Sequence, residues 1–584
     1  MHTSAAAASS RAEVGPTPPP VPEVSDRVKR RSLLTTEALG FKSLSPLGSP
    51  FVSPYNSDDE SEAAKRQKRQ YFKRTYANKK FKDQVHGHIE LPAACIAVMD
   101  TPQFQRLRNL KQLGAAYFVF PGASHNRFEH CVGVSHLAGL MAKHFKEKQP
   151  ELAITDADVT CIQLAGLVHD LGHGPFSHMF DGEFIPRTRP DLGGAYSHEL
   201  MTVFLLDELL RDNEINLADF GLDATDLLFV KEVVLGERVN GGIDARKGRP
   251  LAKSFLYDIV NNVHDGLDVD KLDYAERDAR NTGVKSGCDI DRLIMESRVN
   301  VVNSRPRIVY PDKLVADVLA AFQTRFRLHH TVYQHRVVKA IEMMIVDSLV
   351  AADRAGVFSF RGRNRKDYAL AEAIDDPVAF ALTQDDVLQQ IRLSRLPEAN
   401  KARALVRRID RRELYRSVGE VSVTRVPHRR VAGEDEDDEH STLSQVERKA
   451  DIASLFDLPE ERICALLLET QAAREVNLAR DEVIVEKLRV HHGAGASNPL
   501  ERIYFYSKSN PIRARVLAPS KYGNMCPRDF IKEALRVFCT STSKQRAVAV
   551  HDALLELTSA LRNAPPPFLS LAHTPTFSGS QSSA

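Results

Sequence analysis

The 584-residue sequence predicts a mainly α-helical protein with a helical core and a smaller α+β lobe near its C-terminus. Apolar side chains recur at helical spacing over residues 128–145 and again over residues 159–168, which indicates two core helices. Apolar and aromatic runs between residues 501 and 517 indicate β-strands in the lobe. We also expect one long helix over residues 315–353 and a helix that begins near Pro527.

Composition divides the chain into five predicted segments. Residues 1–78 form a disordered N-terminal segment, because Pro, Ala and Ser dominate it and few aromatic residues are available for a core. Residues 79–426 form the helical core, 427–445 an acidic loop, 446–562 the α+β lobe, and 563–584 a disordered tail. Basic clusters at residues 29–31 and 65–69 fit a nuclear localisation signal as well as solvated charge in a flexible tail. We therefore expect a nuclear protein, with the cytoplasm as the alternative location.

Charge and cysteine usage argue against several classes of protein. Lys and Arg number 79 against 77 Asp and Glu, so the chain as a whole lacks a nucleic-acid or membrane signature. No apolar run approaches the roughly 18–20 residues that a membrane helix needs, and residues 1–22 do not resemble a secretory signal. Seven cysteines without a Cys-x-x-Cys pair indicate reduced thiols in an intracellular protein.

Histidines concentrate in one stretch, since ten of the 21 fall between His86 and His198. A candidate metal site combines His130, the adjacent pair His169 and Asp170 at the end of an apolar helix, and the distant Asp270. A buried carboxylate in such a place is costly unless it is paired or binds a metal. Two imidazoles and two carboxylates suit iron, manganese, cobalt or zinc better than calcium. An isolated His-Asp pair would more often be a capping Asp beside a core His, so the surrounding sequence decides.

The surrounding run, residues 169–178 (HDLGHGPFSH), resembles the signature of HD-domain phosphohydrolases, whose ligand pattern is His…His-Asp…Asp. Within that superfamily the chain is most similar to the SAM- and HD-domain type of deoxynucleoside triphosphate (dNTP) triphosphohydrolase. Similar runs occur in the family's order at residues 100–108, 120–130, 176–182, 268–274 and 333–335. The resemblance covers residues 79–546; the SAM domain has no counterpart, and the segment 1–78 stands in its place.

The resemblance implies hydrolysis of dNTPs to a deoxynucleoside and inorganic triphosphate. It implies one transition metal ion (Fe, Zn or Mn) at His130, His169, Asp170 and Asp270, with Mg on the nucleotides. His178 is then the best candidate for a general acid, and His173 and His198 line the phosphate pocket, although His198 could equally only orient other groups. The implied substrate-binding residues are Arg127, Gln112, Leu113, Lys271, Tyr274, Asp278, Arg325, Tyr333 and Gln334.

Individual roles also follow from the resemblance. Arg127, Lys271 and Arg325 would hold the phosphates. Gln112 and Asp278 would bind the sugar 3′-hydroxyl, while Leu113 and Tyr333 would crowd the 2′ position. Spacing alone adds that four residues share one helix face, which is also the pattern of a solvated basic stripe: Arg325, His329, Tyr333 and Arg336.

Regulation is implied as well, because close relatives are activated by GTP and dNTPs bound between the subunits of a homotetramer. The matching guanine-site residues are Lys79, Asp100, Gln105 and Arg108. The matching residues of the adjacent dNTP site are His88, Val119, Phe120, Arg292, Lys313, Arg412, Arg416 and Lys508. Two positions depart from the family pattern: Pro311 replaces an Arg, and Asp317 replaces an Asn. We expect weaker or altered nucleotide binding at that second site.

Two other functions remain open on the sequence. One is an HD phosphohydrolase of another nucleotide, such as a cyclic nucleotide or a guanosine polyphosphate. The other is a non-catalytic HD protein that binds nucleic acid, since local basic clusters could bind single-stranded nucleic acid weakly. Analysis of the phosphate product formed from dGTP would discriminate among the three functions.

Overall fold

The computed structural model describes residues 76–239, 242–423 and 452–563. The predicted N-terminal segment (1–78), acidic loop (427–445) and tail (563–584) therefore fall almost wholly outside the described residues. Within the described parts, no helix combines the length and the apolar character needed to span a membrane.

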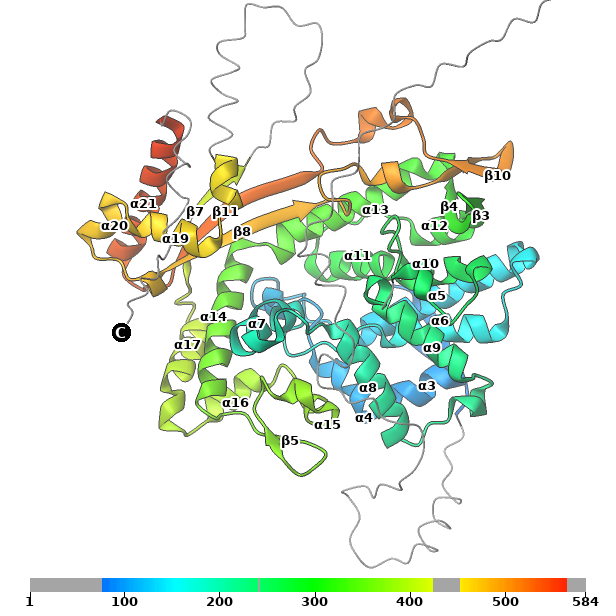
Figure 1. The fold of residues 1–584 in the computed structure, drawn as a ribbon, viewed down its shortest axis with the longest axis horizontal. Coiled ribbons are helices and arrows are strands. Elements are labelled where there is room, and N and C mark those ends of the chain that lie inside the picture. Colours follow the sequence, from blue (N-terminus) through cyan, green and yellow to red (C-terminus); the bar gives the residue numbers. More distant parts are fainter. Residues whose placement is uncertain (1–75, 240–241, 424–451, 564–584) are drawn as a thin grey trace, which may run out of the picture. The chain divides into compact units, whose positions relative to one another are not determined.

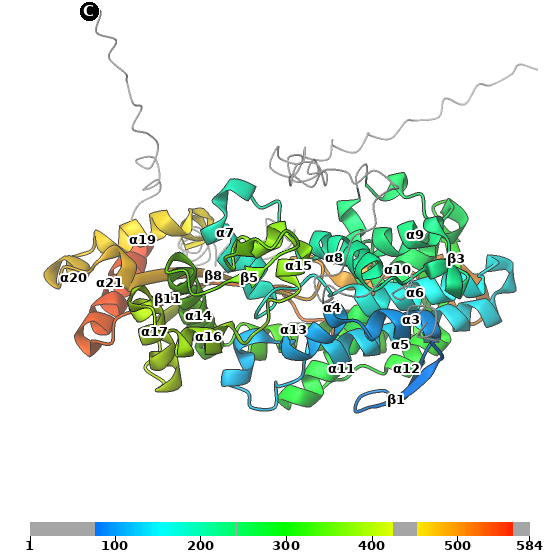
Figure 2. The ribbon, with the colours of Figure 1, turned by 90° about the horizontal axis from the view of Figure 1, so that it is seen from below.

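Helices form most of the structure, as predicted (Figures 1 and 2). At the centre, α5 (Arg127–Lys148) packs on α6 (Asp156–Val168) and α11 (Val269–Thr282), while α6 packs on α9 (Ala224–Leu235). These helices confirm the two periodic stretches found in the sequence. The other helices that build the core are α3 (Ala93–Met99), α4 (Pro102–Gln105), α7 (Ile185–Thr188), α8 (His198–Asp212), α10 (Tyr257–Val260), α12 (Ile290–Glu296), α15 (Pro377–Phe380), α16 (Val387–Leu393) and α17 (Asn400–Asp410).

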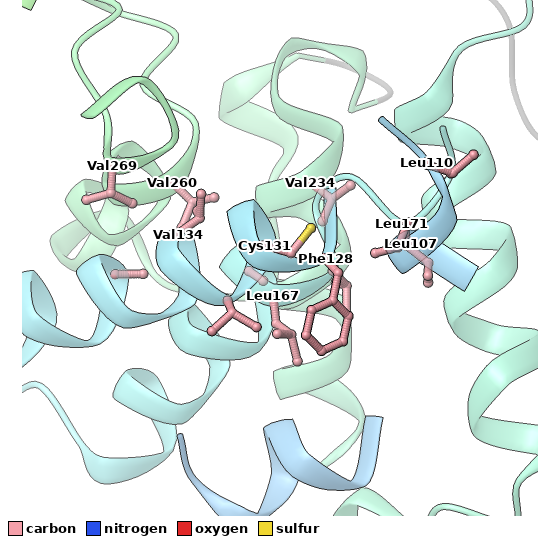
Figure 3. Packing of buried hydrophobic residues seen from close by; sticks show 14 of the residues in the cluster. Leu107, Leu110, Phe128, Cys131, Val134, Leu167, Leu171, Val234, Val260 and Val269 are labelled. Atoms are coloured by element: carbon pink, nitrogen blue, oxygen red, sulfur yellow. The ribbon is translucent and has the colours of Figure 1, made fainter. Parts of the chain in front are cut away.

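The start of each central helix is fixed by its own capping residues. At α6, Thr155 and Asp158 exchange hydrogen bonds between side chain and backbone (2.9 and 3.0 Å). At α11, the Asp268 side chain accepts from the backbone N–H of Lys271 (3.0 Å). Between α5 and α6 the interior is apolar, and Figure 3 shows Cys131 and Leu167 in this packing. Caps and core together set the positions of the polar residues that these helices carry.

The single long helix predicted over residues 315–353 is wrong. The structure has α13 (Val315–Leu328), a π-helical turn (His329–Tyr333) and a separate helix α14 (Arg336–Arg354). His335 is extended (φ −63°, ψ 130°) and its side chain caps α14 by accepting from the Val337 N–H (3.3 Å). The apolar periodicity resumes after the break, so the sequence pattern does not reveal it.

Strands occur in the core as well as in the C-terminal lobe. The hairpin β1 (Lys79–Asp83) and β2 (Gly87–Leu91) precedes the helices, and β5 (Phe360–Arg361) pairs with β6 (Asp367–Tyr368). A four-stranded sheet has the order β10-β9-β4-β3, in which only the β4–β9 pair is parallel. Its strands are β3 (Arg298–Val302), β4 (Arg305–Pro311), β9 (Phe505–Ser507) and β10 (Asn510–Arg515). The strands predicted between residues 501 and 517 are thus confirmed, and they pair with a strand of the core.

The C-terminal sheet has the antiparallel order β7-β11-β8, from β7 (Arg416–Val423), β8 (Val483–His491) and β11 (Ile531–Cys539). Helices α19 (Glu460–Leu468), α20 (Gln471–Glu475) and α21 (Lys544–Asn563) contribute to a second apolar cluster beside this sheet. The helix predicted to begin near Pro527 is wrong, because β11 follows there. Pairing on both sides buries β11 and overrides its local helical preference.

Candidate metal centre and active site

The four predicted ligands come from three helices and meet at one point. His130 lies in the first turn of α5, Asp270 in the first turn of α11, and His169 with Asp170 directly after α6. The Nε2 atom of His130 is 3.0 Å from Oδ1 of Asp270, and Nε2 of His169 is 3.4 Å from the same oxygen. Asp170 lies 3.6 Å from His130 and 3.5 Å from His169, measured from the same imidazole nitrogens to its carboxylate oxygens.

The far side of each imidazole is held by another group. The Nδ1 atom of His130 is 2.7 Å from a carboxylate oxygen of Asp273, and Nδ1 of His169 is 2.9 Å from the carbonyl oxygen of Gly166. Both contacts orient Nε2 toward the shared carboxylates. The Nε2 atom of His169 is buried and has no hydrogen-bond partner among the residues that the structure describes. A buried nitrogen that faces carboxylates and lacks a proton partner fits a metal ion, and so does the mixed imidazole and carboxylate donor set.

The electrostatics of the ligands agree with this fit. Burial lowers the pKa of His130, but hydrogen bonds to Asp270 and Asp273 outweigh it and raise the pKa to about 10. Burial raises the pKa of Asp170, yet the charges of Arg127, His169 and His173 hold it well below its usual range. The carboxylates are therefore ionised at neutral pH, and the raised pKa of His130 reflects their negative potential. A bound metal ion would take the place of the His130 proton, because a ligating imidazole is neutral.

Arg127 connects the metal centre to the loop that carries the other histidines. The buried guanidinium donates from Nη1 to Asp170 and from Nε to Oγ of Ser177 (2.8 Å). Within the described part of the chain, its Nη2 atom is buried without a hydrogen-bond partner. An unpartnered guanidinium nitrogen beside the ligands is a donor available to an anionic group such as a phosphate.

Three histidines form a second group next to the first. The rings of His173 and His198 stack with centroids 3.8 Å apart, and His178 meets both edge-on at 4.9 and 5.6 Å. Asp181 lies 2.8 Å from Nδ1 of His198. One ring nitrogen from each of His173, His178 and His198 and one carboxylate oxygen of Asp181 lie within 4.8 Å of one another.

The members of this group differ in charge and exposure. His173 is fully buried, while the His178 side chain is exposed. Although the His178 side chain reaches solvent, the protein atoms packed around it desolvate the imidazole; this desolvation, then the charges of Arg127 and His198, lower its pKa to about 4. Burial lowers the pKa of His198, but its hydrogen bond to Asp181 outweighs this and raises it. His198 is thus the histidine of this group that favours the protonated form. His178 is neutral at pH 7 as long as no anion is bound next to it.

The predicted sugar-binding residues also lie together. Oδ1 of the buried Asp278 is 2.7 Å from Nε2 of His125, and its Oδ2 accepts a hydrogen bond from the Tyr333 hydroxyl. The backbone N–H of Gln112 donates to the carbonyl of His125 (3.0 Å), and Oε1 of Gln112 is buried without a partner in residues 76–239, 242–423 and 452–563. Leu113 is partly buried against the core. Asp278, Tyr333 and Gln112 thus form one polar group around His125.

The predicted phosphate-binding residues are only partly as expected. Lys271 follows Asp270 on α11 and donates a hydrogen bond to Asp268 (2.8 Å). Burial raises the pKa of the Tyr274 hydroxyl, and the positive charges of Arg325 and Lys271 partly offset this rise. Nη1 of Arg325 donates to the carbonyl of His491 at the end of β8 (2.5 Å). Burial, then the charges of Arg325, His491 and His178, lower the pKa of His329 to about 3.

The predicted shared helix face for Arg325, His329, Tyr333 and Arg336 is wrong, because the π-helical turn and the break separate Arg336 from the others. Arg336 instead lines a cavity of about 760 Å³ together with Arg412 and Arg416. Gln334 lies at the break, where its carbonyl accepts from Arg536 of β11 (2.9 Å).

Most of the predicted activator residues are held by neighbours within this chain. Lys79 pairs with Asp100 (2.6 Å, both partly exposed), and Gln105 accepts from Arg108 (2.7 Å), whose guanidinium lies 3.5 Å from the centre of the Phe128 ring. At the second site, two cations form ion pairs: Arg292 with Asp317 (2.9 Å) and Lys313 with Glu296 (2.6 Å). Two arginines donate to backbone carbonyls: Arg412 to that of Phe118 (3.0 Å) and Arg416 to that of Thr542 (3.0 Å). The ring centres of Phe120 and His335 are 5.6 Å apart. Val119 is partly buried, and His88 and Lys508 are exposed.

Sequence reasoning missed four residues at the site: Asp181, Asp273, His125 and Asp385. Asp181 follows His178 by three positions, and Asp273 follows Asp270 by three, so helical spacing could have suggested both. His125 and Asp385 carry no such signal. Asp385 accepts from the backbone N–H groups of Phe176 (2.7 Å) and Lys111 (2.8 Å), and only the folded chain brings these together.

Comparison with known proteins gives a consistent result. Residues 127–231 match the family model of the HD domain. Deoxynucleoside triphosphate triphosphohydrolase SAMHD1 of Homo sapiens is 37% identical over 480 residues, which are 81% of this chain and 72% of the human protein. The SAMHD1 protein of Gallus gallus is 39% identical over 472 residues (79% and 72%), and the SAMHD1 homolog of Dictyostelium discoideum is 32% identical over 470 residues (80% and 78%).

Proposed function

Because the chain belongs to the SAMHD1 family of deoxynucleoside triphosphate triphosphohydrolases, we propose that its active site hydrolyses dNTPs to a deoxynucleoside and inorganic triphosphate. One observation carries the proposal. The ligand set of His130, His169, Asp170 and Asp270 converges beside a buried guanidinium nitrogen without a partner and beside three clustered histidines. This is the combination that a phosphate ester requires: a Lewis acid, cationic donors and a proton donor.

The metal is proposed to be a single Fe, Zn or Mn ion, with Mg²⁺ accompanying the nucleotides. His130, His169, Asp170 and Asp270 would hold it. When bound, the ion supplies Lewis acidity toward a phosphate oxygen and lowers the pKa of water. The carboxylate of Asp273 and the carbonyl of Gly166 keep the two ligand imidazoles oriented for this task.

The cationic groups are proposed to bind the triphosphate. The Nη2 atom of Arg127 would donate to a phosphate oxygen, because the other two guanidinium nitrogens already contact Asp170 and Ser177. Lys271 and Arg325 lie near Tyr274, and all three would contact the phosphates. Gln334, at the break after the π-helical turn, would complete the wall of the site.

We propose that a water molecule attacks the α-phosphorus, so that its oxygen remains in the released triphosphate, and that His178 protonates the 5′-oxygen of the deoxynucleoside as the bond from this oxygen to the α-phosphorus breaks. The triphosphate brings negative charge next to His178, which raises the pKa of this imidazole from its low value in the free protein. Asp181 keeps His198 protonated beside it, so His198 adds to the positive potential at the phosphates. Burial holds the pKa of His173 well below its usual range, and this neutral imidazole packs against His198.

Sugar selection is proposed to depend on the group around Asp278. The 3′-hydroxyl would donate a hydrogen bond to the Asp278 carboxylate or to the Oε1 atom of Gln112. Tyr333, fixed by its hydrogen bond to Asp278, and Leu113 would leave no room for a 2′-hydroxyl. A ribonucleotide would then lose hydration at its 2′-oxygen without gaining a partner.

Regulation by GTP and dNTPs through a homotetramer is part of the proposal. The partly exposed Lys79–Asp100 pair and the arginine-lined cavity at Arg336, Arg412 and Arg416 support it, because both offer charged groups to an anionic ligand. The Arg292–Asp317 pair would weaken phosphate binding by Arg292, in line with the departure at Asp317. We further propose a nuclear location and, at most, weak binding of single-stranded nucleic acid.

The test is product analysis with dGTP and a Mn²⁺-loaded protein, with and without GTP, by phosphorus NMR. Inorganic triphosphate and deoxyguanosine are expected, and no hydrolysis is expected from Asp170→Ala, which should also lose bound metal by elemental analysis. Orthophosphate or pyrophosphate as the first product would contradict the proposal. Hydrolysis of a cyclic nucleotide or a guanosine polyphosphate in place of dGTP would favour the alternative phosphohydrolase.

A further inference from the structure

The turn of the β1–β2 hairpin reaches the interior behind the metal ligand His130. Within this turn, Oδ1 of Asp83 accepts the backbone N–H groups of Val85 (2.8 Å) and His86 (2.9 Å), which fixes the path of the chain. The Nε2 atom of His86 then lies 2.6 Å from Oδ1 of Asp273 on α11. The hairpin therefore contacts the same carboxylate that contacts His130.

The Asp273 carboxylate is held by three partners. Its Oδ2 is 2.7 Å from Nδ1 of His130, and Arg277 donates to both of its oxygens, from Nε (2.8 Å) and from Nη2 (2.9 Å). With His86 this makes four contacts, which is about the acceptor capacity of a carboxylate. Asp273 and Arg277 are fully buried, so water cannot substitute for a lost partner.

Arg277 extends the contact back to the hairpin. Its Nη1 donates to Oδ2 of Asp83 at 3.0 Å, so that the charges alternate along Asp83, Arg277 and Asp273. The space is also closed on the other side. A Cβ atom at Gly133 of α5 would lie 1.9 Å from Oδ1 of Asp273, so only glycine leaves room for this carboxylate.

We propose that Asp83 and His86 are positioning residues for the metal ligand His130, acting through Asp273 and Arg277. The proposal rests on the metal site proposed above. A carboxylate that accepts from a ligating histidine fixes the ring's tautomer and orientation. Here two residues of an N-terminal hairpin, outside the HD-domain match at residues 127–231, determine where that carboxylate lies. The affinity for the metal consequently depends on the position of the β1–β2 hairpin.

The experiment measures Mn²⁺ affinity of the full chain by titration, with free Mn²⁺ quantified by its electron paramagnetic resonance signal. Asp83→Asn and His86→Ala should each weaken Mn²⁺ binding by about 10- to 100-fold, the usual effect of losing an outer partner of a ligand. Saturating Mn²⁺ should restore kcat in both variants, because neither residue touches the substrate. Lys80→Ala is the matched control, since Lys80 lies on the same hairpin and pairs only loosely with the exposed Glu90 (3.6 Å).

Wild-type Mn²⁺ affinity in both Asp83→Asn and His86→Ala would overturn the inference while leaving the metal site intact. An equal loss of affinity in Lys80→Ala would overturn it as well, because a general weakening of the hairpin would then explain the effect. If Asp83→Asn does not fold, His86→Ala alone decides. Absence of Mn²⁺ binding by the wild-type chain would instead refute the proposed metal site, and the inference with it.

Discussion

At the scale of single residues, His178 offers the sharpest test of the chemistry. His178→Ala should retain metal and substrate binding but lower kcat by roughly 10²- to 10⁴-fold, the range expected for loss of a general acid. The wild-type kcat should fall as pH rises through the pKa of His178 in the substrate complex. The negative charge of the bound phosphates raises the pKa of His178 above its value of about 4 in the free protein. The alkaline limb of the profile should be missing in the variant.

Asp181→Asn provides a graded comparison for this experiment. It removes the carboxylate that keeps His198 charged, so it should weaken dNTP binding more than it lowers kcat. Wild-type turnover in His178→Ala, or an unchanged alkaline limb, would remove His178 from the proton transfer. Steady-state kinetics between pH 5.5 and about 9 separate these outcomes.

Residues with a motif were predictable, and those whose role depends on a partner were not. The predicted ligands His130, His169, Asp170 and Asp270 follow from the His…His-Asp…Asp pattern, and the structure brings these four residues together. Asp273 and Asp181 could have been suggested by their spacing of three from Asp270 and His178. His125 could not, because its contact with Asp278 spans 153 positions of the chain and depends on how α5 and α11 pack.

At the scale of elements, the turn that presents His178 is held in a left-handed conformation. Phe176 and Ser177 have φ values of 59° and 62°, which cost free energy in residues with a side chain. The turn is retained by Asp385, which accepts from the Phe176 N–H (2.7 Å), and by Ser177 Oγ, which donates to the Lys111 carbonyl (2.9 Å). A loop near α16 thereby positions His178, the proposed general acid, from outside the HD-domain match.

We predict that Asp385→Ala lowers kcat by about 10-fold or more and reduces the free energy of unfolding. The change leaves the N–H groups of Phe176 and Lys111 without their acceptor, at a cost of about 1–3 kcal/mol for each buried group. Metal content should stay at the wild-type level. Asp386→Ala is the control, because the neighbouring carboxylate is exposed and, among the described residues, accepts a side-chain hydrogen bond from Gln390 alone (3.3 Å). Equal kcat values for the two variants would contradict a positioning role.

Elements with a regular apolar period were predicted correctly, whereas their interruptions were not. The periodic stretches became α5 and α6, but the stretch over 315–353 divides into α13 and α14. The π-helical turn His329–Tyr333 and the extended His335 shift the helix without disturbing the order of apolar residues. For β11, the deciding factor is hydrogen bonding to both β7 and β8, which a local pattern does not contain.

At the scale of the whole molecule, the predicted activator residues divide into separate groups on one chain. Lys79 and Asp100 form one pair, Arg292 and Asp317 another, and Arg412 and Arg416 line a cavity with Arg336. The sequence order of these residues gave no indication of this division. Basic groups from more than one subunit would be required to neutralise a bound triphosphate, so we expect nucleotide binding and assembly to be linked.

The final prediction concerns that linkage. GTP should promote a tetramer and raise dNTP hydrolysis, because a nucleotide whose charge is shared between subunits binds the oligomer better than the single chain. Asp100→Ala should lose both effects. A guanine edge presents N–H groups that can donate to a carboxylate, and the partly exposed Asp100, which is paired with Lys79 in the structure, could exchange this partner for the guanine. Light scattering and triphosphate release, measured together while GTP is titrated, give both readouts.

The matched control is Asp156→Ala, since Asp156 forms an ion pair of the same length with Lys146 (2.6 Å) at the surface but has no predicted part in nucleotide binding. It should keep the response to GTP, because loss of one exposed pair changes stability by only about 0–1 kcal/mol. Asp100→Ala should also keep its bound metal, which separates the loss of activation from damage to the active site. A strictly monomeric wild-type protein with full activity and no response to GTP would refute the regulatory proposal and leave the catalytic one standing.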